Sequence, residues 1–382
     1  MAEAFKNLIN AETVRHAADH LQRVCTAFDR ERFVQTASRD LNALEFKARA
    51  LRVADGLEAA LPAHFTDAAD TLERALAPPL GFDDKGEPVG LGHRLSEGGL
   101  SGWVLWGAGE FVARRGMDDL PRALACLHAL TQRFTAEFAI RPFIDRHPDA
   151  VLPVLRQWVN DPSAHVRRLA SEGSRPRLPW GLRLQSLVVD PSPTLPLLLS
   201  LQDDPSSYVR RSVANHLNDI AKDHPDVVAH WVQTHLPDAD PARSALLRHA
   251  SRSLIKQGHG PTLKAWGLGS PFAGTASLTL GSKRAHMGDG IDLLVRLRAT
   301  GNRPQDLVVD YVMHHVRANG STAPKVFKGW RRTLAPGDVI DLRKRHSLKE
   351  VTTRQLYAGR HRVALQINGK VVDETDFDLL PA

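Results

Sequence analysis

One segment near the middle of the chain occurs twice. Residues 161–173 read Asp-Pro-Ser-Ala-His-Val-Arg-Arg-Leu-Ala-Ser-Glu-Gly, and residues 204–216 read Asp-Pro-Ser-Ser-Tyr-Val-Arg-Arg-Ser-Val-Ala-Asn-His, at an offset of 43 residues. Repeats of this length are typical of stacked helical hairpins, in which each hairpin buries its apolar face only against its neighbours. The sequence therefore predicts a mainly α fold that begins with a HEAT-like α-solenoid.

A weaker third copy follows the first two. Asp-Pro steps at 161–162, 204–205 and 240–241 suit a helix N-cap followed by proline in the first helical turn. In each copy two polar residues lie four apart, so we expect them on one helical face. These pairs are Arg168 with Glu172, Arg211 with Asn215, and Arg248 with Arg252. Val166, Leu169, Ala170 and Gly173 are predicted to form the packing face of the first copy.

The period of the apolar residues changes from helical to alternating near residue 267. Upstream, Leu120, Leu124, Leu127 and Leu130 recur at helical spacing. Downstream, residues 277–280, 291–297, 307–316 and 363–367 alternate as strands do, and Asn368-Gly369 is a hairpin signal. About seven short strands in some 110 residues favour an immunoglobulin-like β-sandwich. We predict a helical-repeat domain over residues 1–268 and a smaller all-β sandwich domain over residues 269–382.

Charge and composition narrow the classes of function. Residues 271–382 hold 18 Lys and Arg against 11 Asp and Glu, so they carry the whole net charge of +7. Such an excess suits contact with phosphates, although it is also a common solubility feature. No run has the roughly 18 uncharged apolar residues of a membrane helix, and the first residues do not resemble a signal peptide. Cys25 and Cys126 form no ligand pattern, which predicts a cytoplasmic protein without a metal.

Glu172 is the first candidate for chemistry. It ends the first repeat and is followed by a loop with two prolines that carries Arg175, Arg177 and Trp180. A carboxylate amid several arginines is kept ionised and oriented. The alternative is an ordinary surface pair of Arg168 with Glu172 at i, i+4, which contributes roughly 0.3–0.5 kcal/mol to a helix.

Two further acids join this candidate site. Asp219 lies one turn beyond Asn215 on the same helical face, and Glu137 is predicted between aromatic residues on a helix that ends at Pro142. Each acid also has a structural interpretation. Asp219 would then cap a helix or face solvent, and Glu137 would form an ordinary ion pair with Arg133 or Arg141. Acids on nearby repeats would converge on one concave groove.

These residues resemble a known family. The motif His-Val-Arg-Arg-Leu-Ala-Ser-Glu-Gly-Ser-Arg-Pro-Arg-Leu-Pro-Trp-Gly over residues 165–181, the second Val-Arg-Arg at 209–211, and the solenoid followed by a sandwich are similar to the AlkC branch of bacterial DNA alkylation repair glycosylases. The resemblance implies a monofunctional enzyme that excises 3-methyladenine and 3-methylcytosine from duplex DNA and needs no cofactor. It also implies that Glu137, Glu172 and Asp219 are the catalytic acids.

The same resemblance implies how DNA is held. Phosphate contacts are predicted for Arg168, Arg175, Arg177, Arg210, Arg211 and Arg248, and Trp180 is predicted to offer its π-face to a cationic base or sugar. The family's second domain is expected to place a loop in the minor groove, with residues 282–284, 325–328 and 343–346 as candidates. The expected partner is therefore double-stranded DNA with alkylated bases. We expect the protein to bind it as a monomer and not to associate with a membrane. The rival hypotheses are a non-catalytic HEAT scaffold and a DNA-binding protein without glycosylase activity.

Overall fold

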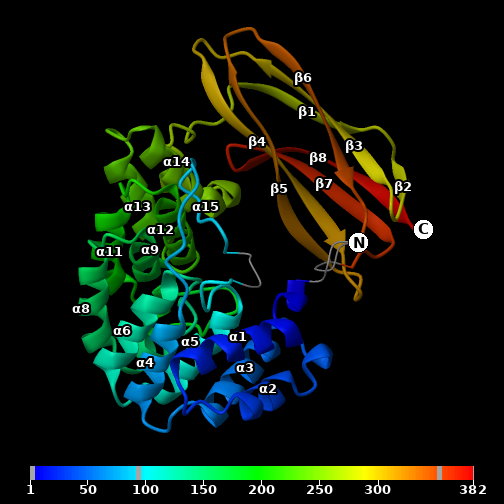
Figure 1. Ribbon diagram of the computed structural model, residues 1–382. Helices are drawn as coiled ribbons and strands as arrows, with labels where there is room; N and C mark the ends of the chain where they lie inside the picture. Colours follow the sequence, from blue (N-terminus) through cyan, green and yellow to red (C-terminus); the bar gives the residue numbers. More distant parts are fainter. Residues whose placement is uncertain (1–4, 92–95, 351–354, 382) are drawn as a thin grey trace. The chain divides into compact units, whose positions relative to one another are not determined.

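A computed structural model describes residues 5–91, 96–350 and 355–381, and it divides into two compact units. One unit comprises Met1–Asp223 with Pro241–Ala250, and the other comprises His224–Asp240 with Ser251–Ala382. Figure 1 shows helices from the N-terminus through the middle of the chain and strands towards the C-terminus. The predicted fold class, a HEAT-like helical solenoid followed by an immunoglobulin-like sandwich, is confirmed.

The first unit contains the helices that carry the candidate acids. Its elements are η1 (Phe5–Leu8), α1 (Ala11–Val24), α2 (Arg30–Ser38), η2 (Leu41–Ala43), α3 (Phe46–Ala60), α4 (Phe65–Ala75), α5 (Val104–Arg115), α6 (Leu120–Thr131), α7 (Arg141–Arg146), α8 (Pro148–Trp158), α9 (Ala164–Gly173), α10 (Gln185–Val189), η3 (Ser192–Thr194), α11 (Leu195–Leu201), α12 (Ser207–Ile220) and α14 (Pro241–Ala250).

The repeated segments form α9 and α12, which pack against each other, and α12 in turn packs against α14. The predicted packing face of α9 is buried as expected, because the two apolar side chains Val166 and Leu169 are 0% and 1% exposed. The helices begin later than the Asp-Pro steps suggest, at N-caps Ser163 and Ser206. Asp161 accepts a hydrogen bond from the Ser163 amide, as Asp204 does from the Ser206 amide, so both aspartates shape the turn before the helix.

The third copy differs from the first two. α14 ends at Ala250, Ser251 forms a turn, and Arg252 begins α15. The prediction that Arg248 and Arg252 lie on one face of a single helix is therefore wrong. A four-residue spacing gives a shared face only where the helix is continuous.

The second unit is built on a sandwich of two sheets, which Figure 1 draws in yellow to red. One sheet has the strand order β1-β3-β6 and the other the order β2-β8-β7-β4-β5. The strands are β1 (Gly274–Leu280), β2 (Arg284–His286), β3 (Gly290–Ala299), β4 (Gln305–Val316), β5 (Thr322–Leu334), β6 (Val339–Ser347), β7 (Gly359–Ile367) and β8 (Lys370–Leu380). Alternation along β3, in which residues 291, 293, 295 and 297 are buried, supplies one wall of the shared core.

The predicted hairpin joins β7 to β8. Ile367 pairs with Lys370, and the two turn residues Asn368 and Gly369 have φ values of 48° and 75°. Positive φ at both positions is the requirement of a type I′ turn, which Asn-Gly meets at little steric cost. The turn is anchored further, because the Val308 amide donates to Oδ1 of Asn368.

Three helices that precede the strands belong to the second unit: α13 (Pro225–His235), α15 (Arg252–Gln257) and α16 (Gly260–Ala265). Ile255, Leu263 and Leu268 pack with Val308 of β4 in a small apolar cluster. The change from helix to strand lies between Ala265 and Gly274, and the predicted boundary at 268/269 falls in this interval. The contacts of α15 and α16 nevertheless place these helices in the same compact unit as the sandwich.

Two of the three predicted loops of the sandwich are strands. Residues 325–328 lie within β5 and residues 343–346 within β6, whereas Ser282 and Lys283 do form a turn before β2. Runs of lysine and arginine suggested loops, but an exposed face of a sheet accommodates charged side chains equally well.

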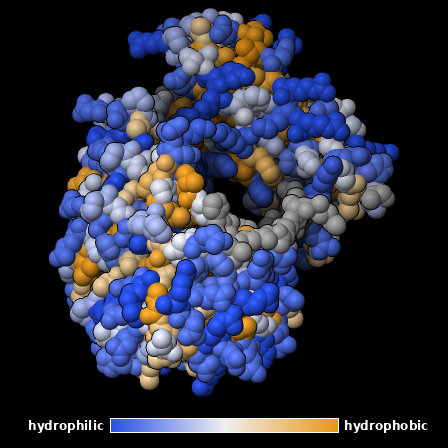
Figure 2. All heavy atoms as spheres, viewed as in Figure 1, coloured by the Kyte–Doolittle hydropathy of each residue, from blue (hydrophilic) through white to orange (hydrophobic). Residues whose placement is uncertain are grey.

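Hydrophilic residues cover most of the face of the protein seen in Figure 2, and hydrophobic residues appear on it in separate patches.

Candidate active site

Glu172 lies at the end of α9 and is buried, with 5% of the residue exposed. Gly173 follows it against Ile140, where a Cβ atom would approach the Cγ2 atom of Ile140 to 2.5 Å. The absence of a side chain at this position therefore lets the end of α9 pack closely on the turn before α7. This packing holds the Glu172 carboxylate inside the repeat stack.

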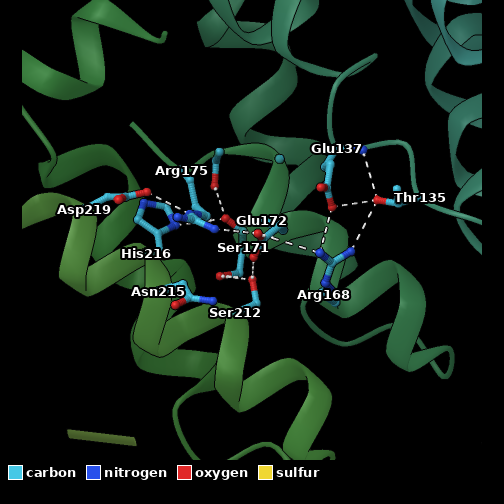
Figure 3. Close-up of polar contacts among 12 residues, drawn as sticks. Thr135, Glu137, Arg168, Ser171, Glu172, Arg175, Ser212, Asn215, His216 and Asp219 are labelled. Carbon is cyan, nitrogen blue, oxygen red and sulfur yellow. Dashed lines mark hydrogen bonds and ion pairs between the residues drawn. The ribbon is translucent and has the colours of Figure 1, made fainter. Parts of the chain in front are cut away.

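Both oxygens of the Glu172 carboxylate are bound (Figure 3). Oε1 accepts a hydrogen bond of 2.6 Å from Nη1 of Arg175 and lies 3.7 Å from Nη2 of Arg168. Oε2 accepts a hydrogen bond of 2.6 Å from the hydroxyl of Ser212, on α12. The predicted Arg168–Glu172 pair is thus one contact within a larger buried network.

Asp219 is joined to Glu172 through one guanidinium group. Nε of Arg175 donates to Oδ2 of Asp219 at 2.8 Å, while the other oxygen of Asp219 accepts from Lys222 at 2.8 Å. Asp219 is 2% exposed, so this carboxylate is neither a cap nor a solvated charge. Arg175 therefore fixes the two acids relative to each other.

Glu137 approaches the site from the turn between α6 and α7, and its predicted placement on a helix is wrong. Its partner is Arg168, whose Nη2 lies 2.7 Å from Oε2, and the hydroxyl of Thr135 donates to the same oxygen at 2.7 Å. Arg133 and Arg141, the partners expected from local sequence, donate instead to backbone carbonyls. Arg133 donates in this way to Ala77, and Arg141 to Gly173 and Leu182, all of which lie far away in the sequence.

The electrostatics favour the charged forms of Glu172 and Arg168. Burial disfavours the charged form of Glu172, but the positive charges of Arg168 and Arg175 outweigh this and lower its pKa below the ordinary value. The pKa of Arg168 is raised because Glu137 and Glu172 outweigh its own desolvation. The guanidinium carbon of Arg168 also lies 4.9 Å from the ring centroid of Tyr208, a cation–π contact.

A pocket of about 340 Å³ opens beside this network. Its polar wall includes Glu137, Glu172, Arg168 and Arg175, and its lining does not include Asp219 among the described residues. The remaining described lining is mostly apolar and aromatic: Leu91, Trp103, Phe134, Phe138, Leu178, Pro179, Trp180 and Tyr208, together with Thr135. Two carboxylates therefore line an aromatic pocket, and Asp219 is connected to its polar wall by the hydrogen bond from Arg175.

Trp180 stands at the mouth of the pocket in an unusual conformation. Its φ is 64°, its exposure is 62%, and its ring stacks on Trp106 at 6.4 Å with an interplanar angle of 9°. A left-handed backbone is strained for a bulky residue and persists only where the surroundings enforce it. Lys47 donates to the Trp180 carbonyl at 3.3 Å, and the buried Arg141 ties the following Leu182 carbonyl to the loop at 2.5 Å.

The other predicted basic residues lie outside the pocket lining. Arg177 pairs with Asp223, Arg211 makes two hydrogen bonds of 2.6 Å to Glu87, and Arg248 lies on α14. Arg210 donates to the carbonyls of residues 204 and 205, as Arg167 does to those of residues 161 and 162. A part in phosphate binding stays a prediction for each of them.

Sequence reasoning missed several residues of this site. Ser212, Thr135 and Tyr208 hold the charged groups, and the aromatic walls come from four separate segments. Only Ser212 leaves a trace in the sequence, because it occupies the repeat position at which the first copy has the core residue Leu169. Within the described ranges, no cluster of three or more His, Cys, Asp or Glu is arranged to hold a metal ion, and no helix is long and apolar enough to cross a membrane.

Two known protein families match separate parts of the chain. The family model "DNA alkylation repair enzyme" matches residues 133–254, which include all three candidate acids. The model "Uncharacterised protein YhaZ, C-terminal Ig-like domain" matches residues 274–381. Together they define a helical-repeat protein of the DNA alkylation repair class that carries an immunoglobulin-like domain.

Two relatives align over almost the entire chain. YhaZ of Bacillus subtilis (strain 168) is 33% identical over 380 residues, which are 98% of this chain and 99% of the relative. The Pseudomonas fluorescens alkylpurine DNA glycosylase AlkC, solved with DNA containing an abasic site analog, is 37% identical with a TM-score of 0.89, over 99% of this chain and 100% of that one. The chain belongs to the AlkC-type family of DNA alkylation repair glycosylases, which confirms the resemblance drawn from the sequence.

Proposed function

We propose that the chain is a DNA glycosylase that hydrolyses the N-glycosidic bond of cationic N3-alkylated bases, 3-methyladenine and 3-methylcytosine, in duplex DNA. The observation that carries the proposal is that carboxylates held in ion pairs with arginine line an aromatic pocket. Glu137 and Glu172 line that pocket; Arg168 pairs with Glu137 and lies close to Glu172, and Arg175 pairs with Glu172. A positively charged base is attracted both to carboxylates and to aromatic faces.

The leaving group sets what the enzyme must supply. A base alkylated at N3 already carries a positive charge, so the electron pair of the C1′–N bond neutralises the base as it leaves, and no general acid is needed. The sugar becomes an oxocarbenium-like cation, which preorganised carboxylates stabilise at the moment its charge develops. The oxygen of a water molecule then bonds to C1′ and loses its proton to a carboxylate acting as general base. The products are the neutral base and an abasic site.

We assign the acids separate tasks within this reaction. Glu137 and Glu172 line the pocket and act on the sugar cation and the water, while Asp219 holds Arg175 against Glu172. Hydrolysis by water rather than by an amine makes the enzyme monofunctional. The described pocket lining contains no lysine that would form a Schiff base.

Contacts with DNA phosphates are proposed for Arg177, Arg210, Arg211 and Arg248. Arg168 and Arg175 are assigned to the carboxylates instead, because both are paired with acids and little exposed. Exposed basic residues of β5 and β6, such as Lys325 and Arg343, supply further positive charge on the sandwich. We propose that one copy of the chain binds one lesion, as a monomer.

Release of free base from methylated duplex DNA tests the proposal. We expect the wild type to release 3-methyladenine and 3-methylcytosine and to leave strands that break only on alkaline treatment. Glu172→Gln should lose about a hundredfold or more in rate, as expected when a preorganised electrostatic group is removed. Glu110→Gln is the matched control, because Glu110 pairs with Arg114 on α5 and does not line the pocket.

The rival hypotheses give different results in the same assay. A scaffold would show neither release nor preference for methylated DNA. A DNA-binding protein without catalysis would bind methylated duplex with a steep salt dependence and release nothing. Failure of folded wild-type protein to release either base would refute the proposed activity.

A further inference from the structure

Ser212 is a buried polar residue at a packing position of the repeat. In the alignment of the two copies it takes the position of Leu169, and both residues are buried, at 2% and 1% exposure. A hydroxyl in place of an apolar side chain lowers stability unless it is hydrogen-bonded. The polar residue at this packing position therefore needs a reason beyond the stacking of the repeats.

Its hydrogen bonds give that reason. The Oγ atom of Ser212 lies 2.6 Å from Oε2 of Glu172 and 3.1 Å from Oγ of Ser171. A hydroxyl carries a single proton, and the shorter contact is to a charged oxygen, so Ser212 donates to Glu172 and accepts from Ser171. In Figure 3 the two serines lie below Glu172, whereas Arg168 lies to its right.

We propose that Ser212 is a positioning residue for the glycosylase reaction, acting through the orientation of the Glu172 carboxylate. The inference rests on the proposed function. Arg175 holds one oxygen of Glu172 and Ser212 holds the other, so the terminal torsion of the side chain, which is broad in a free glutamate, has one setting. Each oxygen keeps a lone pair for the sugar cation or for water.

The chemical nature of the residue matters as well. A lysine or arginine at position 212 would also hold the carboxylate, but its positive charge would oppose the cation that develops on the sugar. A neutral hydroxyl orients Glu172 and keeps its full negative charge available. Its hydrogen bond favours the ionised form of Glu172, in the same direction as the two arginines.

Single-turnover excision by Ser212→Ala, measured across pH, tests this inference. We expect the rate at neutral pH to fall about tenfold or more, because a hydrogen bond to a charged group is lost. The acid limb of the pH–rate profile should move up by about one pH unit, since the carboxylate loses a donor. Affinity for DNA with an abasic site should stay within about twofold, and Ser212→Thr, which retains the hydroxyl, should recover most of the rate.

Ser174→Ala is the matched control. Ser174 is fully buried, but its hydroxyl donates only to backbone carbonyls of α9, so its loss should leave the acid limb in place. Three results would overturn the inference: an unchanged rate and acid limb in Ser212→Ala, an equal shift in Ser174→Ala, or no recovery by Ser212→Thr.

A second measurement separates this inference from the proposed function. If the wild type releases no base, the proposed activity fails, but the contact can still be tested by denaturant unfolding of Ser212→Ala, Glu172→Gln and the double variant. We expect Ser212→Ala to lower the unfolding midpoint less in the Glu172→Gln background than in the wild type. Equal losses in the two backgrounds would show that Ser212 does not act on the charged carboxylate of Glu172, and would overturn the inference.

Discussion

A buried histidine beside the acids makes the stability of the first unit depend on pH. His216 lies on α12 with no exposed surface, and its Nδ1 lies 2.9 Å from the carbonyl oxygen of Ser171. Burial lowers the pKa of His216 to about 4, with a further contribution from the positive charge of Arg175. The folded protein therefore holds a neutral ring that donates from Nδ1 to Ser171 at neutral pH.

The sign and size of the effect follow from this pKa. The ordinary pKa of a histidine is about 6.5, so on acidification the unfolded chain takes up the proton first, and the folded state loses stability as pH falls from about 6.5 to about 4. Each unit of difference corresponds to about 1.4 kcal/mol. The full loss is thus about 3 kcal/mol, of which about 2 kcal/mol falls between pH 7 and pH 5.

Urea unfolding of the wild type and of His216→Asn, followed by the helical circular dichroism signal at several pH values, measures this contribution. The asparagine amide retains a donor near the position of Nδ1 but does not titrate. We expect the variant to be less stable at pH 7, because it leaves a cavity, and the difference to shrink by about 2 kcal/mol by pH 5. The same substitution at the exposed His64 controls for the loss of a histidine elsewhere. Parallel stability curves for wild type and His216→Asn would refute the reasoning.

Three other substitutions probe the site and the fold. Arg175→Lys should destabilise the first unit by about 3 kcal/mol in thermal or urea unfolding and abolish most excision. The reason is that one ammonium group cannot bridge both carboxylates as the guanidinium does. Stability and excision rates within error of the wild type would contradict this prediction. Trp180→Ala should lower the rate of base release at least tenfold and leave the unfolding midpoint nearly unchanged, since the side chain is 62% exposed; a matching loss of stability would point to a structural role. Gly173→Ala should cost about 1–3 kcal/mol of unfolding free energy through the clash with Ile140, and a neutral effect would show that the end of α9 can shift.

Patterns that are local in the sequence predicted local structure well. The 43-residue repeat predicted the packing of α9 on α12, and alternating apolar residues predicted β3 and β4. Asn368-Gly369 predicted a two-residue hairpin because only a few residue pairs tolerate positive φ at both positions. The prediction for the third repeat was wrong at Ser251, because the sequence alignment continues there but the helix is interrupted.

The partners of the charged residues could not be predicted in the same way. Glu137 was expected to pair with a neighbour in the sequence, but it pairs with Arg168, and Arg211 pairs with Glu87, 124 residues away. Charge pairing depends on which chain segments meet, and a periodic pattern does not contain that information. The aromatic walls of the pocket could not be predicted for the same reason. Trp103 and Tyr208 come from distant segments, and in the sequence each looks like an ordinary core residue.

The exceptions to ordinary packing are concentrated at one place, and this concentration is an argument for function. Ser212 replaces a leucine of the repeat, Trp180 has a left-handed backbone, and Glu172 and Asp219 are buried in ion pairs with Arg175. Each feature lowers stability relative to an apolar or unstrained alternative, because buried ion pairs are often no more stable than well-packed hydrophobic residues. In the same helices the aligned residues Val166 and Val209 follow the packing rule, and both are fully buried. Independent departures from stability that meet around one aromatic pocket are what a preorganised active site requires, and a scaffold that only stacks its repeats would have no use for them.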